Sequence, residues 1–327
     1  MKNKLLKPSP ESILAAAETL KSGELVAFPT ETVYGLGADA CNEAAVKRIY
    51  YAKNRPVNNP LIVHVVNLNT ARSIAEFSKI EISLAKEFWP GPLTLILNKC
   101  SSSISDKVTA GLPTVGVRVP KNAIALSLLK AFGGPIAAPS ANKSGEVSPT
   151  LAKHTFDIGK SIQNILDGDH CEIGLESTIV KCQSDKIKIL REGAITKEQI
   201  QRFISINFPK FHLSTECSGS KIIAPGQSLA HYSPKSKIRL NISNPSSEDI
   251  YLSFGPMPTS ARGFSLSEKK SLDEAGKNLY NFLRRADELI LNDKYNKWHY
   301  IAVAPIPKIG LGASINDRLF RASSLKL

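Results

Sequence analysis

The sequence of 327 residues has no long apolar run and no paired cysteines. No stretch approaches the roughly 18 apolar residues of a membrane-spanning helix, and the start offers only Leu5 and Leu6 before Lys7, which is too little for a secretory signal. The five cysteines are odd in number and never stand in a Cys-x-x-Cys spacing, which argues against a disulfide framework or a structural zinc site. These absences predict a cytoplasmic protein with free thiols and no membrane association.

Several motifs of well-known catalytic sites are also absent. There is no Gly-x-x-x-x-Gly-Lys-Ser/Thr, so any bound ATP is not held by a Walker loop. Gly35-Leu36-Gly37 begins a Gly-x-Gly-x-x-Ala pattern, but it lies six residues past its strand and opens no helix directly, so it is a poor dinucleotide fingerprint. The six histidines show no paired ligand spacing, and no serine stands in Gly-x-Ser-x-Gly. A permanent transition-metal site and covalent hydrolase chemistry therefore lack support.

The composition that remains is that of a globular, basic protein. Hydrophobic residues make up 42% and charged residues 22%, which are ordinary values for a folded domain, and the length suggests about two domains. Forty-two Lys and Arg against 29 Asp and Glu leave a formal charge of +13. An excess of this sign favours polyanionic partners or substrates such as nucleotides and RNA.

Short apolar strands alternate with amphipathic helices, which is the pattern of an α/β protein. Strands are expected at residues 25–28, 61–66, 93–97, 115–119, near 136 and near 165, and at 178–181, 187–190, 250–254 and 300–303. Helices are expected from Ser9-Pro10 to Gly23 and at 42–52, 71–77, 80–88, 123–132, 197–204, 269–291 and 317–322, and residues 30–37 are expected to form a loop. The predicted units are a first domain over 1–208, a linker over 209–237 that docks on it, and a small α/β unit over 238–327.

The stretch from Lys53 to His64 combines two cations with a proline and a buried strand. Because a proline disfavours the helical conformation of the residue before it, Arg55 should be extended, and side chains two apart in extended chain point the same way. Lys53 and Arg55 are therefore predicted to form a fork that faces an anionic ligand. The alternative is a solvated basic loop after a helix. A lone histidine on a core strand, such as His64, is more often a structural residue than a ligand contact.

Other predicted strands also end in hydroxyl groups and cations. These groups are Thr30 and Thr32, Asn59, Thr114 with Arg118, the serines from Ser140 to Ser148, Ser177, and Arg191. Each serine or threonine alone is ordinary turn chemistry, and Arg191 has a salt bridge as its alternative. Arg118 points away from three valines in an alternating strand and needs an anionic partner. Together the groups suit phosphoryl or nucleotidyl transfer, which needs positioning and positive charge around developing negative charge.

Seven short motifs along the chain carry a resemblance to a known family. They are Pro29-Thr30-Glu31-Thr32-Val33-Tyr34-Gly35-Leu36-Gly37, Lys53 to His64, Trp89-Pro90-Gly91-Pro92-Leu93-Thr94, Ala137-Ala138-Pro139-Ser140-Ala141-Asn142, Glu176-Ser177-Thr178, Pro225-Gly226 to His231-Tyr232-Ser233-Pro234, and Asn316-Asp317-Arg318 to Arg321-Ala322-Ser323. The first five resemble the YrdC-like threonylcarbamoyl-AMP synthases over about residues 10–205, and the last two resemble the long, two-domain members. The resemblance implies a twisted open mixed sheet of the YrdC-like type, a linker covering the active site, and a small C-terminal Rossmann-like α/β domain.

The resemblance also implies a reaction. The amine of L-threonine takes up CO2 or bicarbonate to give a carbamate, which attacks the α-phosphate of ATP and releases pyrophosphate, leaving threonylcarbamoyl-AMP. The enzyme is thus expected to be a nucleotidyltransferase, with Mg2+ accompanying ATP because the triphosphate charge must be neutralised. A separate tRNA threonylcarbamoyl transferase is expected to receive the product for modification of the adenosine beside the anticodon, and weak tRNA binding by this chain is a further expectation.

The matching positions give the expected site residues. ATP contacts are expected at Arg55, Asn59, Thr114, Ser140, Ser148, Arg191 and Tyr232. Threonine contacts are expected at Thr32, His64, Arg118, Ala138 (through its backbone) and Ser177. Lys53 and Arg55 are the expected catalytic residues beside the phosphates, and no protein-held metal is expected.

The sequence departs from the family at two places, and other classes of function stay open. Glu192-Gly193 stands where Pro-Gly is common, so an acid beside Arg191 is expected to weaken the hold of Arg191 on a phosphate, and Gly226-Gln227 stands where Gly-Met is common. One alternative is an RNA-binding module, which the charge would serve, although only 7% of residues are aromatic and base stacking needs such side chains. Another is a ligand-sensing module on the same scaffold.

Overall fold

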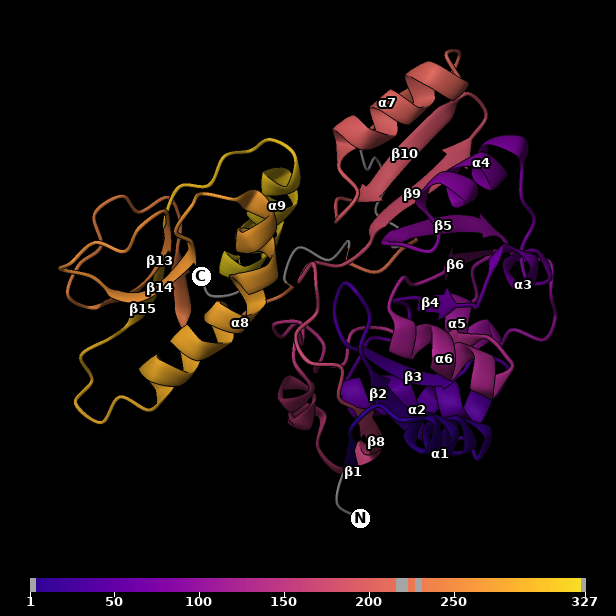
Figure 1. The fold of residues 1–327 in the computed structure, drawn as a ribbon, viewed down its shortest axis with the longest axis horizontal. Helices are drawn as coiled ribbons and strands as arrows, with labels where there is room; N and C mark the ends of the chain where they lie inside the picture. Colours follow the sequence, from indigo (N-terminus) through magenta and orange to yellow (C-terminus); the bar gives the residue numbers. More distant parts are fainter. Residues whose placement is uncertain (1–3, 216–222, 227–230, 325–327) are drawn as a thin grey trace.

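The computed structural model describes residues 4–215, 223–226 and 231–324, which form a large and a small α/β unit (Figure 1). The large unit contains β1 Lys4–Leu6, α1 Pro10–Lys21, β2 Leu25–Phe28, β3 Gly35–Asp39, α2 Glu43–Lys53, β4 Ile62–His64, α3 Leu68–Arg72, α4 Lys79–Phe88, β5 Leu93–Asn98, α5 Asp106–Thr109, β6 Thr114–Arg118, α6 Ala123–Phe132, β7 Ile136–Ala137, the 3-10 helix η1 Ala152–Ser161, β8 Ile162–Leu166, β9 Thr178–Gln183, β10 Lys186–Arg191, α7 Lys197–Asn207 and β11 His212–Ser214. The small unit contains β12 Lys237–Arg239, β13 Asp249–Phe254, β14 Arg262–Ser267, α8 Leu272–Leu291, β15 Tyr300–Val303 and α9 Leu311–Ser323.

The large unit is built on one mixed sheet, which confirms the predicted fold class. Among the described residues its strand order is β1-β8-β2-β3-β7-β4-β6-β5-β9-β10-β11. β4 pairs parallel with β6, whereas β3 pairs antiparallel with β2 and β7, and β6 antiparallel with β5. β7, β4 and β6 are neighbours in this order, and His64 at the end of β4 pairs with Arg118 of β6 and Ile136 of β7. Segments far apart in the sequence therefore lie side by side in the sheet.

Helices cover both faces of this sheet. Along β2, Val26 and Phe28 pack in one cluster with α1 and α6, while Leu25 and Ala27 belong to the cluster that contains α2 and α4. This division follows from the period of a strand, in which successive side chains point to opposite faces. A sheet covered on both faces explains why its strands are continuous apolar runs.

The ends of the helices follow the predicted capping signals. Ser9 caps α1 through the amide of Ser12, and Pro10 occupies the first turn. Asn42 caps α2 through the amide of Ala45. These local hydrogen bonds satisfy amides that have no partner within the helix, so the sequence alone located both starts correctly.

One expected loop is partly a strand. Residues 30–37 were predicted to form a loop, but β3 begins at Gly35 and pairs with β2. A Cβ at Gly37 would lie 2.8 Å from Cε1 of Phe28, so the glycine lets the two strands approach. A glycine inside a strand often marks such a close approach, and for this reason the glycine-rich stretch is partly strand and not only loop.

The small unit has a parallel sheet with strand order β12-β15-β13-β14. Figure 1 shows α8 and α9 on the side of this sheet that faces the large unit. α8 buries Leu279, Tyr280, Leu283 and Ala286 on one face. α8 starts at Leu272, after its N-cap Ser271, and α9 extends well beyond the predicted 317–322. Within the described residues, no helix is both long and apolar enough to cross a bilayer.

The predicted linker is partly structured. β11 pairs parallel with β10 and adds an outer strand to the large sheet, and Glu146 forms a β-bridge with Ser233. The linker therefore contacts the large unit at more than one point. Cys217 and the Gln227 departure lie outside the described residues.

Each unit contains one tryptophan, so fluorescence can follow the unfolding of each unit separately. Trp89 packs against the core of the large unit and Trp298 against that of the small unit. We expect Leu283→Ala to cost about 2–5 kcal/mol, because it leaves a cavity beside α8. In urea unfolding of single-tryptophan variants, Leu283→Ala should lower the midpoint reported by Trp298 fluorescence more than the midpoint reported by Trp89. Leu84→Ala in the core of the large unit should instead lower the Trp89 midpoint more. Equal shifts from both probes in both variants would show that the units unfold as one.

Candidate active site

A cavity opens where strand-end loops of the large sheet meet the linker. Its lining residues are Thr30, Thr32, Val33, Tyr34, Gly35, Arg55, Ile62, His64, Arg118, Ala138, Pro139, Ser140, Glu176, Ser177, Arg191, Pro225, Gly226, His231 and Tyr232. Nine of the thirteen predicted site residues are among them, namely Thr32, Arg55, His64, Arg118, Ala138, Ser140, Ser177, Arg191 and Tyr232. The structure thus gathers the predicted loops around one space.

The other four predicted residues are not among the lining residues. The Oδ1 of Asn59 accepts from Nη2 of Arg55 at 2.6 Å. Ser148 donates to Oε1 of Glu176 at 2.6 Å. Thr114 begins β6 and is buried. Lys53 is buried at the end of α2, and its Nζ donates to the carbonyl of Ser140 at 2.6 Å. Asn59, Ser148 and Lys53 thus bond to residues of the lining, whereas Thr114 stays a prediction.

The predicted fork of Lys53 and Arg55 is wrong. Lys53 is the last residue of α2, and Asn54 adopts the left-handed conformation with φ 50° and ψ 46°. This turn sends the two side chains to different places. Nζ of Lys53 donates to the carbonyls of Ser140, at 2.6 Å, and Asn142. The prediction assumed extended chain from Lys53 onward, but the proline constrains only the residue next to it.

Arg55 lines the cavity and forms no ion pair with an acid among the described residues. Its Nε donates to the carbonyl of Asn59 at 3.1 Å, and its Nη2 to Oδ1 of Asn59 and to the carbonyl of Pro60 at 2.8 Å. Burial lowers the pKa of Arg55 to about 10, so the guanidinium stays charged at neutral pH. Burial also lowers the pKa of Lys53, with the charge of Arg55 acting in the same direction.

Arg191 is held in a similar way at the end of β10. Its Nε and Nη2 donate to the carbonyl of Ser177 at 3.1 and 2.8 Å. Gly226 of the linker has φ +86°, and a Cβ there would lie 2.8 Å from Cδ of Arg191. The glycine therefore permits both the turn and the close approach of the linker to Arg191.

Glu192 does not share this cavity. Its side chain lines a separate cavity with Lys197 and Lys308, and its backbone carbonyl accepts from Arg318 at 2.7 Å. Burial, together with the charge of Asp317, raises the pKa of Glu192. The acid next to Arg191 in sequence thus lines a different cavity from Arg191.

A second group of polar residues lies near Arg118. Nη2 of Arg118 is 2.7 Å from Oε1 of Glu31, and both side chains are buried. This is a close ion pair whose atoms lack hydrogen-bond geometry. His64 packs edge-on against Phe28, and burial with the neighbouring Arg118 lowers the pKa of His64 to about 3, so the imidazole is neutral at neutral pH. The predicted anionic partner of Arg118 is thus Glu31, which was not among the predicted site residues.

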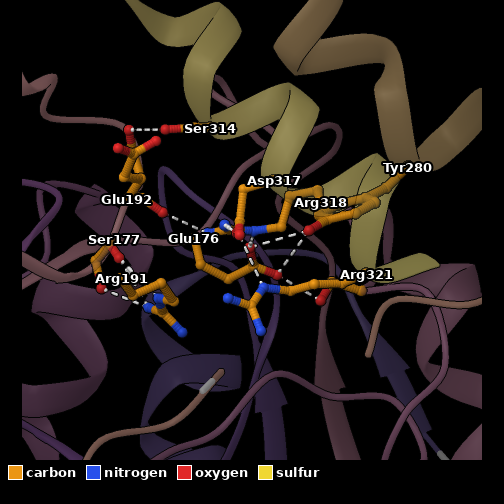
Figure 2. A network of polar contacts seen from close by, with 11 residues as sticks. Glu176, Ser177, Arg191, Glu192, Tyr280, Ser314, Asp317, Arg318 and Arg321 are labelled. Carbon is orange, nitrogen blue, oxygen red and sulfur yellow. Dashed lines mark hydrogen bonds and ion pairs between the residues drawn. The ribbon is translucent and has the colours of Figure 1, made fainter. Parts of the chain in front are cut away.

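Glu176 is the centre of a polar network that joins the two units (Figure 2). Its Oε2 accepts from Nε of Arg318 at 2.8 Å, and Tyr280 donates to its two oxygens at 3.1 and 3.0 Å. Burial opposes ionisation, but the charges of Arg318 and Arg191 and the Ser148 hydroxyl outweigh it and lower the pKa of Glu176 to about 2. The sequence motifs contained Glu176 and Arg318, but no local pattern indicated that they pair.

This pairing makes a testable contribution to stability. A carboxyl whose folded pKa lies below its unfolded value stabilises the protein above about pH 4.5, and that stability is lost as the pH falls toward 2. Glu176→Gln should therefore cost about 3 kcal/mol at pH 7, and its difference from wild type should shrink below pH 4.5. Urea unfolding at pH 7, 4 and 3 measures this, with Glu87→Gln on the exposed side of α4 as the control. A difference that is the same at all three pH values would contradict it.

Two family models match consecutive parts of the chain. One, described as telomere recombination and named for Sua5, YciO and YrdC, matches residues 18–193, and one described as threonylcarbamoyl-AMP synthase, C-terminal domain, matches residues 195–324. The boundary between the two matches falls at the start of α7.

Full-length relatives and a solved structure agree with these matches. Threonylcarbamoyl-AMP synthase of Bacillus subtilis is 39% identical, over 95% of this chain and 92% of its own length. The enzyme of Pyrococcus abyssi is 36% identical, over 96% of this chain and 95% of its own length. The structure of P. abyssi Sua5 complexed with L-threonine matches with a TM-score of 0.85 and 34% identity, covering 98% of this chain and 97% of that one. The chain therefore belongs to the threonylcarbamoyl-AMP synthase family, in its long, two-domain form.

Proposed function

We propose that this chain synthesises L-threonylcarbamoyl-AMP from L-threonine, bicarbonate or CO2, and ATP, with release of pyrophosphate. This reaction would be the first step of N6-threonylcarbamoyladenosine formation in tRNA. The observation that supports it most strongly is one cavity in which Arg55 and Arg191 are held by uncharged oxygens, beside an arginine–glutamate pair, in a chain that matches synthases over nearly its full length.

The Arg55 and Arg191 side of the cavity suits a triphosphate. Carbonyl oxygens position the two guanidinium groups and leave their net charge for a ligand. Nucleotidyl transfer needs such fixed positive charge, because negative charge develops on the leaving pyrophosphate. In this proposal Arg55 contacts the phosphates directly. Lys53, also proposed as catalytic, fixes the turn from Ser140: its Nζ donates to the carbonyl of Ser140 at 2.6 Å, and its own carbonyl accepts from the amide of Ser144 at 2.8 Å.

The Arg118 side suits an amino acid. Arg118 lines the cavity, and a guanidinium group pairs readily with a carboxylate such as that of an amino acid. Glu31, which does not line the cavity, lies 2.7 Å from Nη2 of Arg118 and holds this side chain in place. The neutral His64 and the hydroxyl of Thr32 offer hydrogen bonds in the same space.

Mg2+ is proposed to arrive with ATP. Glu176 is the carboxylate that lines the cavity, and both of its oxygens already accept hydrogen bonds. Mg2+ is often held by substrate phosphates and water with few protein ligands, and such binding fits this wall. When bound, the ion would neutralise the triphosphate. We further propose that the product passes to a tRNA threonylcarbamoyl transferase, and that any tRNA affinity of this chain is weak.

Pyrophosphate release is the direct test of the function. Purified protein with ATP, Mg2+ and bicarbonate should release pyrophosphate only when L-threonine is added. Arg55→Ala should reduce the rate at least about 100-fold, since a charged contact in a desolvated site is worth about 3 kcal/mol. Arg48→Ala, on the exposed side of α2, should keep the wild-type rate.

Other outcomes identify the alternatives. Threonine-independent release would reject the synthase. Salt-sensitive tRNA binding without turnover would indicate an RNA-binding module, and threonine binding without turnover a ligand sensor.

Arg118→Lys tests the amino-acid side separately. Lysine keeps the charge that balances Glu31 but lacks the planar pair of donors that fits a carboxylate. We expect the KM for threonine to rise about tenfold or more, while the affinity for ATP changes less than about threefold. Steady-state kinetics with threonine varied, and calorimetry with ATP alone, give the two values. Weakened ATP binding with an unchanged KM for threonine would place Arg118 in the wrong subsite.

A further inference from the structure

An acidic side chain in the wall of an anion-binding cavity needs an explanation. Glu176 lines the same cavity as Arg55 and Arg191, which we assign to a triphosphate. A free carboxylate facing phosphates at about 6 Å would weaken their binding by roughly tenfold to a hundredfold at the effective dielectric of a protein interior. The negative charge of Glu176 must therefore be balanced by a cation outside the ligand space.

Arg318 of the C-terminal domain supplies this positive charge from outside the cavity. It is fully buried on α9 and does not line the cavity. Its Nε donates to Oε2 of Glu176 at 2.8 Å, its Nη1 to Asp317 at 2.6 Å and its Nη2 to the carbonyl of Glu192 at 2.7 Å. Figure 2 shows the guanidinium between α9 and the loop that carries Glu176. Arg318 thus binds Glu176 on the side away from the ligand space.

The same helices also fix Tyr232 of the linker. Cζ of Arg318 lies 4.9 Å from the centre of the Tyr232 ring, and Tyr280 stacks on that ring at 5.8 Å with an angle of 25°. Tyr232 lines the cavity, and its buried hydroxyl has no hydrogen-bond partner among the described residues. Tyr280 and Arg318 therefore act on two cavity-lining groups at once.

We propose that Arg318 is a positioning residue for nucleotide binding, which neutralises Glu176 and holds its carboxylate against the C-terminal domain so that the cavity accepts a triphosphate. This rests on the proposed assignment of the cavity to ATP. It gives the C-terminal domain a defined role in a site whose phosphate-binding cations all come from the large unit.

The test is a pair of substitutions read by calorimetry with Mg2+-ATP and no threonine. Arg318→Met should weaken ATP binding at least about tenfold, because Glu176 then loses its directly bonded counter-charge beside the phosphates and shares Arg191 with them. The double variant with Glu176→Gln should bind ATP within about threefold of wild type, because the charge that Arg318 must hold is gone. A double variant that binds as weakly as Arg318→Met would overturn the proposal. In turnover, Arg318→Met should raise the KM for ATP and change kcat less than about threefold.

If Arg318→Met does not fold, the double variant and Arg318→Lys still test the proposal. An uncompensated buried carboxylate is strongly destabilising, whereas a neutral pair of similar volume is usually tolerated, so the double variant should fold and is compared with wild type directly. Arg318→Lys keeps the charge and should bind ATP within about threefold of wild type. Loss of ATP binding in either folded variant would contradict the proposal.

Arg284→Met is the matched control. Arg284 also reaches from the C-terminal domain to the large unit, where it contacts Asp157 at 2.6 Å and the carbonyl of Val147, but it does not contact Glu176. Its substitution should leave ATP affinity within about twofold. Equal weakening by Arg284→Met and Arg318→Met would mean that general domain docking is responsible. Wild-type protein that does not bind ATP would overturn the proposed function as well, whereas wild-type binding that Arg318→Met leaves unchanged would overturn only this inference.

Discussion

Buried positive charge is the constraint on which the rest of the site depends. A cation removed from water loses hydration worth several kcal/mol, so a protein must supply other oxygens to it. Lys53, Arg55 and Arg191 obtain these oxygens mainly from backbone carbonyls. A carbonyl accepts a hydrogen bond without carrying a net charge, so these hydrogen bonds stabilise the buried cations without neutralising them. The strand-end loops thus form a wall of buried basic side chains held by backbone oxygens, as the proposed binding of a triphosphate requires.

Two other arginines at or beside the cavity are paired with acids. Arg118 pairs with Glu31 within the large unit, whereas Arg318 pairs with Glu176 and joins the two units. In the proposed function the two pairs differ in role: Arg118 meets the carboxylate of the amino acid, and Arg318 balances a charge that would oppose a phosphate.

The sequence located the loops of this site well because their signals are local. Capping residues, apolar strands and prolines identified the segments, and nine predicted residues line the cavity. The pairings escaped prediction because Glu176 is separated by 104 positions from Tyr280 and by 142 from Arg318. No periodicity reports a contact over such a distance. The direction of Lys53 depended instead on a single left-handed residue, Asn54, which reversed a prediction based on alternation.

The ion pair between the units is better explained by specificity than by stability. Replacing a buried pair with apolar groups is often neutral or stabilising, so its presence does not by itself indicate a stronger interface. An apolar contact between α9 and the large unit would tolerate sliding, since it has no preferred direction. Arg318 donates to Glu176 and to the carbonyl of Glu192, both in the large unit, and Tyr280 donates to Glu176 as well, so these bonds specify one orientation of the two units. That orientation also places the ring of Tyr232, which makes the geometry of the cavity depend on the domain that lies outside it.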